Sequence, residues 1–290
     1  MNAAWQRLWS LLRLGGAIAL LARGEPAWAV ALLLITPLGL LLLFLTLAPP
    51  GPTQRQASLA QRLRAWAKEC VVNERVFGLD QPWRAGDQAP ALAVSARGDK
   101  GVLLLHGFCC NRGLWRPWVA RLQAAGVPVM ALTLEPAFGS IDAYADPIDA
   151  AVRQLHAATG HMPVIVAHSM GGLAARAWWR AHGARHTQAP RLISLGTPHL
   201  GTRIATLSPA TNARQMRCGS SWLAQLPPMP DVDCLWSPCD QIVQPAGNAC
   251  QPGARLHRVD ATGHLALIDT PEAWALLQRA LLSDPQLSDA

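Results

Sequence analysis

Charged side chains are scarce in this sequence. Asp, Glu, Lys and Arg together make up 15% of its 290 residues, whereas an average chain carries about a quarter. This composition excludes a disordered chain and excludes acidic or basic low-complexity tails. The net charge is +7, but no run of Lys and Arg occurs, which argues against a nucleic-acid-binding surface. We therefore expect no nucleic-acid partner.

Cysteine patterns that would indicate a metal site or a disulfide framework are also lacking. The seven Cys residues have spacings that match no zinc site, and a chain of this length does not depend on disulfides to fold. We expect no metal and no cofactor. The adjacent Cys109 and Cys110 are open to two interpretations, a strained vicinal disulfide that acts as a redox gate or, as we favour, small side chains packed beneath a loop. If the domain is exported, one or two disulfides among the four Cys between residues 218 and 250 are plausible.

Ala27–Ala48 forms 22 consecutive apolar or uncharged positions, and this run predicts a helix that crosses a membrane. At 1.5 Å per residue it covers the roughly 30 Å hydrocarbon core, and Pro37 and Gly39 are tolerated in such helices. The alternatives are the buried core helix of a soluble domain and a cleaved signal peptide. The run exceeds an ordinary signal-peptide core of about 7–15 residues, and two prolines follow its only small-residue exit directly. An uncleaved anchor is therefore favoured.

A second apolar stretch, Leu8–Ala22, precedes this anchor but contains Arg13, Gly15 and Gly16. We predict that it is an interfacial helix rather than a second span. If it did span, both ends of the protein would lie on one side of the membrane. Arginines occur on both sides of the anchor, so the positive-inside rule does not give a clear orientation.

Composition divides the chain into three parts. Residues 1–50 form the membrane region. Residues 51–87 begin with the end of a Pro-rich linker, Pro49–Gln56. An amphipathic helix is predicted next, at Ala57–Arg75, and it lies either on the membrane or against the domain. Its apolar positions are Leu59, Leu63, Ala65, Ala67 and Val71. Residues 88–285 form the third part, a predicted globular domain that contains all the chemical motifs described below.

Buried strands alternate with helices in this last part. The predicted helices are 115–125, 141–160 and 169–183. The predicted strands are Ala91–Ala96, Val102–His106, Pro128–Leu134, Pro163–His168, Arg191–Gly196, Val232–Trp236 and Leu256–Ala261. Continuous apolar strands that alternate with helices are typical of a parallel sheet covered on both faces. The pattern predicts an α/β fold with a doubly wound, mostly parallel sheet.

The strongest chemical signal is the segment Val164–Gly172, with the sequence VIVAHSMGG. A buried strand runs into a sharp turn centred on Ser169, and a helix follows at once, which is the pattern of a nucleophile elbow. Ala167 stands where the motif usually has its first glycine. The plain alternative is a serine that caps an ordinary strand-to-helix turn.

A second element, His106-Gly107-Phe108, follows the strand Val102–His106. Acyl transfer needs two N–H donors directed at the developing oxyanion. The backbone amides of Phe108 and Met170 are the natural pair, and His106 is expected to hold the loop.

With these motifs the chain resembles the α/β-hydrolase family, and within it the bacterial lipases and esterases. The segments that carry the resemblance are Leu103–Phe108, Leu134–Asp142, Val166–Arg176, Ser194–Thr202 and Asn212–Leu226. The resemblance implies a catalytic triad in the chain order Ser, Asp, His. Some relatives bind a structural calcium ion, but no ligand cluster in this sequence can be assigned to one.

Asp240 is the preferred acid of this triad, because it follows the apolar strand Val232–Trp236 at the position of the family's acid. Asp260 is the alternative, although it falls inside the next predicted strand. The remaining candidates are less favoured, namely Asp231, Asp233, Asp269, Asp284 and Asp289.

His264 is the preferred base, since it comes just after the strand that follows Asp240. His199 is expected to shape a loop, and His168 is expected to point away from Ser169. The proposed site is thus Ser169, Asp240 and His264, with an oxyanion hole at Phe108 and Met170.

The segment Leu200–Pro230 has no clear strand pattern. A stretch of this length without sheet is usually functional in a compact domain, so we predict a small lid or part of the acyl-pocket rim. A solvated connection is the alternative.

These features predict a serine hydrolase of carboxylic esters with lipid-like acyl groups. Alternatives on the same triad are an acyltransferase and a deacylase of a lipid-linked substrate, and a membrane-tethered binding protein without catalysis is more remote. The favoured location is a single-pass anchor in a bacterial inner membrane with the catalytic domain in the periplasm. The expected partners are an ester or lipid substrate and the membrane, and the sequence does not indicate the oligomeric state.

Overall fold

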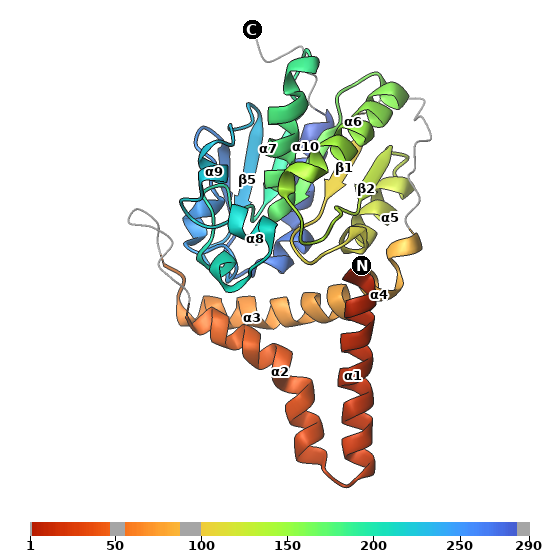
Figure 1. Ribbon diagram of the computed structural model, residues 1–290, viewed down its shortest axis with the longest axis vertical. Coiled ribbons are helices and arrows are strands. Elements are labelled where there is room, and N and C mark those ends of the chain that lie inside the picture. The colour runs from red at the N-terminus through yellow and green to blue at the C-terminus, as the bar shows by residue number, and fades with distance from the viewer. Residues whose placement is uncertain (1, 47–55, 88–99, 283–290) are drawn as a thin grey trace.

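The computed structural model describes residues 2–46, 56–87 and 100–282 (Figure 1). The predicted strand Ala91–Ala96 and nearly all of the linker Pro49–Gln56 lie outside the described residues. A domain with a central sheet adjoins a helical N-terminal part (Figure 1).

Six parallel strands form one sheet within the described residues, in the order β2-β1-β3-β4-β5-β6. They are β1 (Val102–Leu105), β2 (Val129–Leu132), β3 (Val164–His168), β4 (Leu192–Leu195), β5 (Val232–Trp236) and β6 (Arg255–Arg258). The predicted doubly wound parallel sheet is confirmed. The last strand differs from the prediction Leu256–Ala261, because the chain leaves the extended conformation before Ala261, where φ is 50°.

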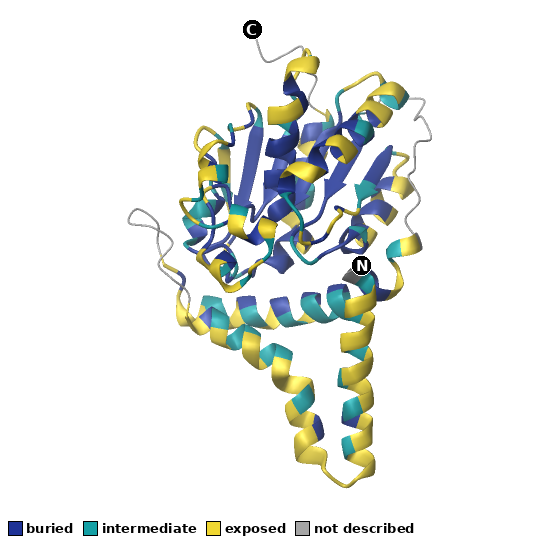
Figure 2. Ribbon diagram, viewed as in Figure 1, coloured by how far each residue is buried: buried dark blue, intermediate teal, exposed yellow. Residues whose placement is uncertain are grey.

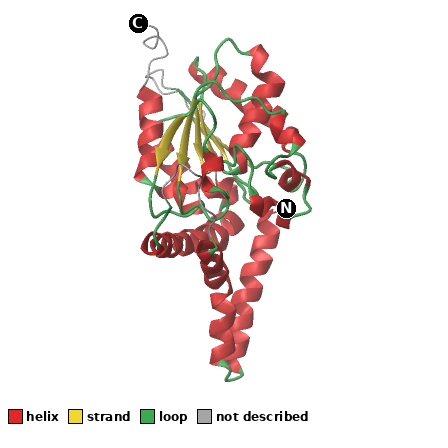
Figure 3. Cartoon of the chain, turned by 90° about the vertical axis from the view of Figure 1, so that its left-hand side faces the viewer, coloured by secondary structure: helices red, strands yellow, loops and turns green. Residues whose placement is uncertain are grey.

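Helices cover both faces of the sheet (Figure 3). Leu103 and Leu105 of β1 pack with α6 (Ala145–Thr159) and α7 (Met170–His182). Their neighbours Val102 and Leu104 point to the opposite face and pack with α5 (Arg116–Ala124) and α10 (Pro271–Leu282), as the two-residue period of a strand requires. Short 3-10 turns precede or follow these helices: η3 (Arg112–Trp115), η4 (Ile141–Tyr144) and η5 (Gly183–Arg185).

The N-terminal residues form a helical hairpin. The helices α1 (Asn2–Ala22) and α2 (Pro26–Leu45) run antiparallel and project from the domain (Figure 1). Leu8–Ala22, which we predicted to be an interfacial helix, belongs to α1 and is paired with α2. The pairing follows from small residues: Ala17 and Ala29 are buried between the helices, and a Cβ atom on Gly16 would lie 2.9 Å from Leu32.

Apolar side chains cover the outside of this hairpin. Most of its surface is exposed (Figure 2), including Ile18 at 67% and Trp28 at 68%. Among the described residues, α2 is the helix that is long and apolar enough to cross a membrane, by length and composition. An exposed apolar surface of this size is typical of a binding or membrane-facing surface.

A third segment connects the hairpin to the domain that contains the sheet. It consists of α3 (Leu59–Asn73), the π-helix η1 (Glu74–Asp80), α4 (Gln81–Trp83) and the 3-10 turn η2 (Ala85–Asp87). The indole N–H of Trp66 donates to the carbonyl of Pro37 in α2 at 2.8 Å. The predicted apolar face of α3 is only partly correct: Ala65 is buried, but Leu59, Leu63 and Val71 are exposed.

The segment Leu200–Pro230 folds as a small cap with η6 (Arg203–Leu207), α8 (Thr211–Gln215) and α9 (Ser221–Ala224). Its side chains Met216, Leu223 and Leu226 are buried in the core, so the alternative of a solvated connection is wrong. The cap contacts the loop after β2, where the Asn212 side-chain amide donates to the carbonyl of Ala137 at 2.9 Å.

A buried arginine joins both ends of this cap to the domain. The Arg176 guanidinium donates to the carbonyls of His199, Leu226 and Pro227. Burial lowers the pKa of Arg176 to about 10. The three carbonyl acceptors therefore hold a cation that stays charged at neutral pH.

All seven cysteines lie within the described residues, and none of them forms a disulfide there. Neither the vicinal disulfide of Cys109 and Cys110 nor a disulfide between residues 218 and 250 is formed. Cys110 is buried, which agrees with the favoured interpretation of packing beneath the loop.

Candidate active site

Ser169 occupies a strained turn at the carboxyl end of β3. Its backbone has φ 54° and ψ −126°, a combination that costs a non-glycine residue about 1–3 kcal/mol and persists only where the surrounding structure imposes it. The Ser169 N–H donates to the carbonyl of Leu195 at 2.9 Å, and α7 begins at the next residue. This is the geometry of a nucleophile elbow.

Two glycines allow this turn to form. A Cβ atom on Gly171 would lie 2.6 Å from the carbonyl oxygen of Leu105, and one on Gly107 would lie 2.8 Å from Cβ of Ser169. Larger residues at either position would push β1 or its following loop away from Ser169. The loop that carries Phe108 is thereby held against the serine.

Asp240 and His264 form a buried pair at the same edge of the sheet. Asp240 follows β5, and one carboxylate oxygen accepts the N–H groups of Ile242 and Val243 at 2.8 and 2.7 Å. Its other oxygen is 2.8 Å from Nδ1 of His264. These contacts hold the carboxylate in one orientation.

The protonation of His264 follows from this contact. A carboxylate can only accept, so the hydrogen on the imidazole lies on Nδ1, and Nε2 is left as the acceptor. Burial lowers the pKa of His264, but the charge of Asp240, the hydrogen bond to Asp240 and the charge of Glu69 outweigh it and raise the pKa above its ordinary value. The arrangement stabilises the imidazolium that forms when His264 accepts a proton.

Other acids considered from the sequence have different partners. Asp233 is buried at the start of β5, where Arg191, Arg255 and His257 contact its carboxylate. Asp260 lies beyond the end of β6, is half exposed and pairs with Arg258 at 2.8 Å. Asp231 pairs with Arg255 and Asp269 with Arg75. Asp284 and Asp289 lie outside the described residues.

His106 has the loop-holding role that the sequence indicated. Its Nε2 accepts the N–H of Leu134 at 2.9 Å, and its Nδ1 is 2.8 Å from the carbonyl oxygen of Gly107. Burial lowers the pKa of His106 to about 4. The neutral ring therefore joins the loops that follow β1 and β2.

His168 and His199 are likewise buried and structural. The Nε2–H of His168 donates to the carbonyl of His264 at 3.1 Å, and the two imidazole centroids are 4.7 Å apart. His199 lies 3.0 Å from the hydroxyl of Ser194. Burial holds the pKa values of both rings well below the ordinary value, so both are neutral at neutral pH.

The predicted oxyanion donors lie on either side of Ser169 along the sheet edge. Met170 is the first residue of α7, and Phe108 belongs to the loop after β1, the strand next to β3. From β1 the chain adds β2 on one side of the sheet and then β3 on the other side, so the order of the strands reverses between β1 and β3. In open α/β sheets, ligands bind at the carboxyl ends of the strands at such a reversal. The ring of Phe108 contacts that of Phe138 edge-on, with centroids 5.7 Å apart.

Sequence reasoning missed two residues that hold the loop of His264. The Gln241 side-chain oxygen accepts the N–H of His264 at 3.0 Å, and its amide donates to Glu69 at 2.6 Å. The Glu69 carboxylate also accepts the N–H groups of Leu265 and Ala266, both at 2.9 Å, at the start of the 3-10 turn η8 (Leu265–Asp269).

Glu69 is only 2% exposed. Burial raises its pKa, and the hydrogen bonds from Leu265, Ala266 and Gln241 and the charge of His264 oppose this shift. The signal in the sequence was its place on α3, four residues after Ala65 and three before Val72, which are both buried. An acidic residue on the buried face of a helix indicates a specific partner.

No group of three or more His, Cys, Asp or Glu side chains with the arrangement of a metal site occurs among residues 2–46, 56–87 and 100–282.

Comparison with known proteins supports this architecture. Residues 102–228 match the family model described as "Alpha/beta hydrolase family". The mature lipase BlEst2 of Bacillus licheniformis is similar in structure, with 17% identity, a TM-score of 0.54, and coverage of 67% of this chain and 94% of that chain. Lipase B of Aspergillus fumigatus gives 18% identity and a TM-score of 0.59, over 68% of this chain and 55% of that chain. A comparison with curated proteins gave no match.

The resemblance to the α/β hydrolases is thus confirmed, and this chain contains a domain with the α/β-hydrolase fold. The fold and its relatives support a hydrolase. The N-terminal hairpin lies outside the residues that the family model matches.

Proposed function

We propose that this protein is a membrane-anchored serine hydrolase that cleaves carboxylic esters with lipid-like acyl groups. Ser169 is the nucleophile, His264 the general base and acid, and Asp240 the residue that orients His264. The observation that carries the proposal is the Asp240–His264 hydrogen bond of 2.8 Å at the sheet edge where Ser169 has its strained backbone.

In the acylation step, Nε2 of His264 takes the hydroxyl proton of Ser169 as Oγ attacks the ester carbonyl carbon. Asp240 remains ionised and stabilises the imidazolium. The negative charge moves to the carbonyl oxygen, which the amides of Phe108 and Met170 bind. Each such donor contributes about 2.7–4 kcal/mol to the transition state.

The tetrahedral intermediate collapses when His264 gives its proton to the leaving alcohol oxygen. The C–O bond breaks, and the acyl group stays on Ser169. Water then attacks the acyl-enzyme, His264 takes a proton from that water, and the acid is released with Ser169 restored.

The test is hydrolysis of p-nitrophenyl esters from C2 to C16 by the full-length protein in detergent micelles, with Ser169→Ala beside it. We expect the variant to lose about 10⁴- to 10⁶-fold in kcat. Labelling of the wild type by an ethyl fluorophosphonate, and its loss in Ser169→Ala, tests the nucleophile without an assumed substrate. A folded wild type that neither reacts with the probe nor hydrolyses any ester would refute the proposal.

We further propose that the hairpin of α1 and α2 is the membrane anchor. Its exposed surface is apolar, and α2, with 20 residues, spans about 30 Å as a helix. Because α1 and α2 are antiparallel, the N-terminus and the catalytic domain share one side of any membrane that the hairpin enters.

This pairing changes the expected orientation. A single-pass anchor with a short N-terminus favours a periplasmic catalytic domain. With a hairpin, the basic residues Arg62, Arg64 and Lys68 of α3 lie on the same side as the N-terminus, whereas the far turn holds Arg23 close to Glu25. The positive-inside rule assigns the more basic side to the cytoplasm. We therefore propose a cytoplasmic catalytic domain.

Fusion of a reporter to the C-terminus tests this orientation. Green fluorescent protein is expected to fluoresce in cells, and alkaline phosphatase, which is active only after export, is expected to stay inactive. The opposite pair of results would favour the periplasm.

A further inference from the structure

A cavity of about 520 Å³ lies between the N-terminal helices and the catalytic domain, within the range of about 300–1,000 Å³ of small-molecule sites. The rings of Trp5 and Trp9 from α1, Phe77 from η1 and Phe138 from the loop after β2 supply much of its wall. Two segments far apart in the sequence therefore build one apolar site.

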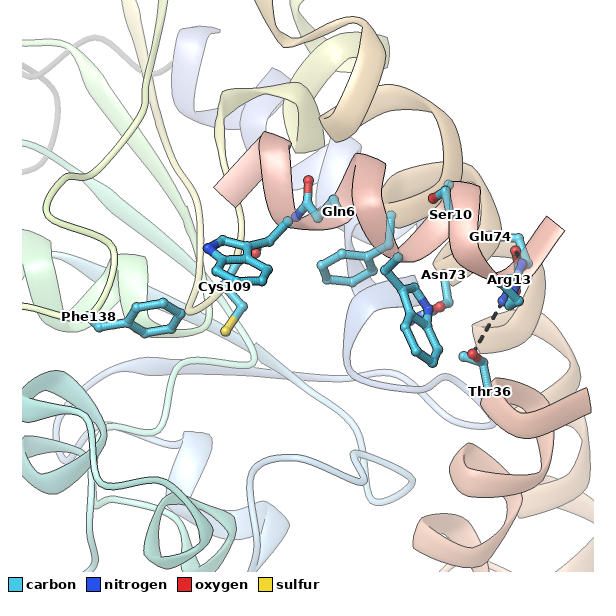
Figure 4. A pocket seen from close by; sticks show the side chains of 12 residues that line it. Gln6, Ser10, Arg13, Thr36, Asn73, Glu74, Cys109 and Phe138 are labelled. Carbon is cyan, nitrogen blue, oxygen red and sulfur yellow. Dashed lines mark hydrogen bonds and ion pairs between the residues drawn. The ribbon is translucent and has the colours of Figure 1, made fainter. Parts of the chain in front are cut away.

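One end of the cavity adjoins the candidate active site. Cys109 and Phe138 line this end (Figure 4). Cys109 directly follows the proposed oxyanion residue Phe108, and Phe138 contacts the Phe108 ring. A group that fills this end of the cavity would therefore lie next to the oxyanion loop.

The other end adjoins the hairpin. Arg13 of α1, Thr36 of α2 and Glu74 of η1 lie there together (Figure 4). Arg13 donates to both Glu74 and Thr36, so the two charges of this end are paired with each other. The cavity thus extends from both helices of the hairpin to the loop beside Ser169.

The chemistry of the lining favours a neutral, apolar ligand. The ion pair of Arg13 and Glu74 leaves neither charge alone to bind an anion. Burial raises the pKa of Cys109 to about 11, so at neutral pH its thiol is uncharged and acts as a small apolar group.

From this juxtaposition we propose that the cavity between α1, η1 and the loops after β1 and β2 binds the acyl chain of a membrane lipid ester and leads it from the hairpin to Ser169. The proposal rests on the proposed ester hydrolase function and specifies its substrate. The anchor is then one wall of the substrate site as well as an attachment to the membrane.

Filling the cavity tests this assignment. Gly78 lines it, and a Cβ atom there meets only the Glu74 side chain, at 3.7 Å, so Gly78→Leu adds bulk without a backbone clash. Ser10→Leu narrows the cavity from the opposite wall. The matched control is Gly39→Leu, the same substitution at an exposed position of α2 where a Cβ atom meets nothing within 4 Å.

The readout is the rate at which Ser169 is labelled by a hexadecyl fluorophosphonate relative to an ethyl fluorophosphonate. In the reaction Ser169 Oγ bonds to phosphorus, fluoride leaves, and the proton passes to His264. The full-length protein is reconstituted in phosphatidylcholine vesicles. We expect Gly78→Leu and Ser10→Leu each to lower the hexadecyl-to-ethyl ratio at least tenfold, and Gly39→Leu to keep the wild-type ratio. Tenfold is about 1.4 kcal/mol, or the loss of about two buried methylene groups.

The outcomes separate this proposal from the proposed function. If neither probe labels the folded wild type, the hydrolase function itself fails. If both probes label Ser169 but the filled variants keep the wild-type ratio, the acyl chain binds elsewhere and the cavity proposal is overturned. A fall in the rates of both probes by the same factor also overturns it, because the hexadecyl-to-ethyl ratio is then unchanged and filling the cavity has no selective effect on the long acyl chain.

Discussion

Replacing Glu69 by Gln removes one negative charge and one hydrogen-bond acceptor from the loop of His264, with almost no change in side-chain volume. In the wild type, Oε1 accepts from Gln241 and Leu265, and Oε2 accepts from Ala266. A glutamine can keep two of these bonds through its oxygen, but its NH₂ group then faces the N–H of Ala266. Glu69 thus acts through the loop, as a positioning residue.

The magnitude follows from the bond that is lost. A hydrogen bond to a charged group contributes about 1.5–3 kcal/mol, and a buried donor left unpaired adds to the loss. We expect Glu69→Gln to destabilise the fold by about 2–3 kcal/mol. Since displacement of a catalytic group by 1 Å can cost about 100-fold in rate, we expect a 10- to 100-fold fall in kcat, with a smaller change in KM.

The pH profile gives the readout that a purely structural role would not change. Glu69 helps to raise the pKa of His264, and the reaction needs neutral His264. Removing the charge should lower the pKa of His264 and move the acidic limb of kcat/KM to lower pH. The assay is C4 ester hydrolysis between pH 5 and 9, with Glu272→Gln, an exposed residue of α10, as the charge-matched control.

Two results would refute the reasoning. One is a Glu69→Gln variant with kcat within twofold of the wild type and an unmoved acidic limb. The other is an equal shift of the limb in Glu272→Gln, which would mean that net charge rather than the contact sets the pKa of His264.

Further predictions follow from single contacts. Asp240→Asn should lower kcat about 10⁴-fold, since His264 loses its orienting partner, whereas Asp260→Asn should stay within twofold; ester kinetics decide. The acidic limb of wild-type kcat/KM should lie above pH 6.5, because the pKa of His264 is raised. The hydrogen bonds from Arg255 and its neighbours hold the pKa of Asp233 low. Asp233 therefore stabilises the fold above about pH 4, and this stabilisation is lost as the pH falls. Asp233→Asn should lower the free energy of unfolding, measured in urea, by about 3–5 kcal/mol. Arg176→Met should expose the cap to limited proteolysis.

The sheet and the Asp240–His264 pair could be predicted because both depend on local patterns. Strands buried on both faces must be apolar throughout, so runs such as Val164–Val166 stand out in the sequence. Asp240 and His264 could be selected because each follows a predicted strand at the position where the α/β hydrolases that the chain resembles have their acid and base.

The N-terminal part could not be predicted to the same degree, because its structure depends on contacts between distant segments. The pairing of α1 with α2 rests on close approach at Gly16 and Leu32, which periodicity does not indicate. Similarly, apolar periodicity selected Leu59 and Val71 as the buried face of α3, whereas a charged residue, Glu69, lies on the face that meets the domain.

The cavity also depends on side chains that no motif marks. Trp5 and Phe77 come together only because the first turns of α1 lie beside η1. From the sequence alone, the tryptophans near the N-terminus are indistinguishable from residues at a membrane interface.

The contact of Glu69 with Leu265 spans 196 positions in the chain, and this distance has a consequence for synthesis. At about 5–20 residues per second, the ribosome needs about 10–40 seconds after Glu69 to make the backbone that this carboxylate binds. By then the hairpin has long left the ribosome and can already be in the lipid. The loop of His264 would therefore be completed last. On the proposed function, a chain interrupted before its final strand would have its anchor in the membrane but no activity.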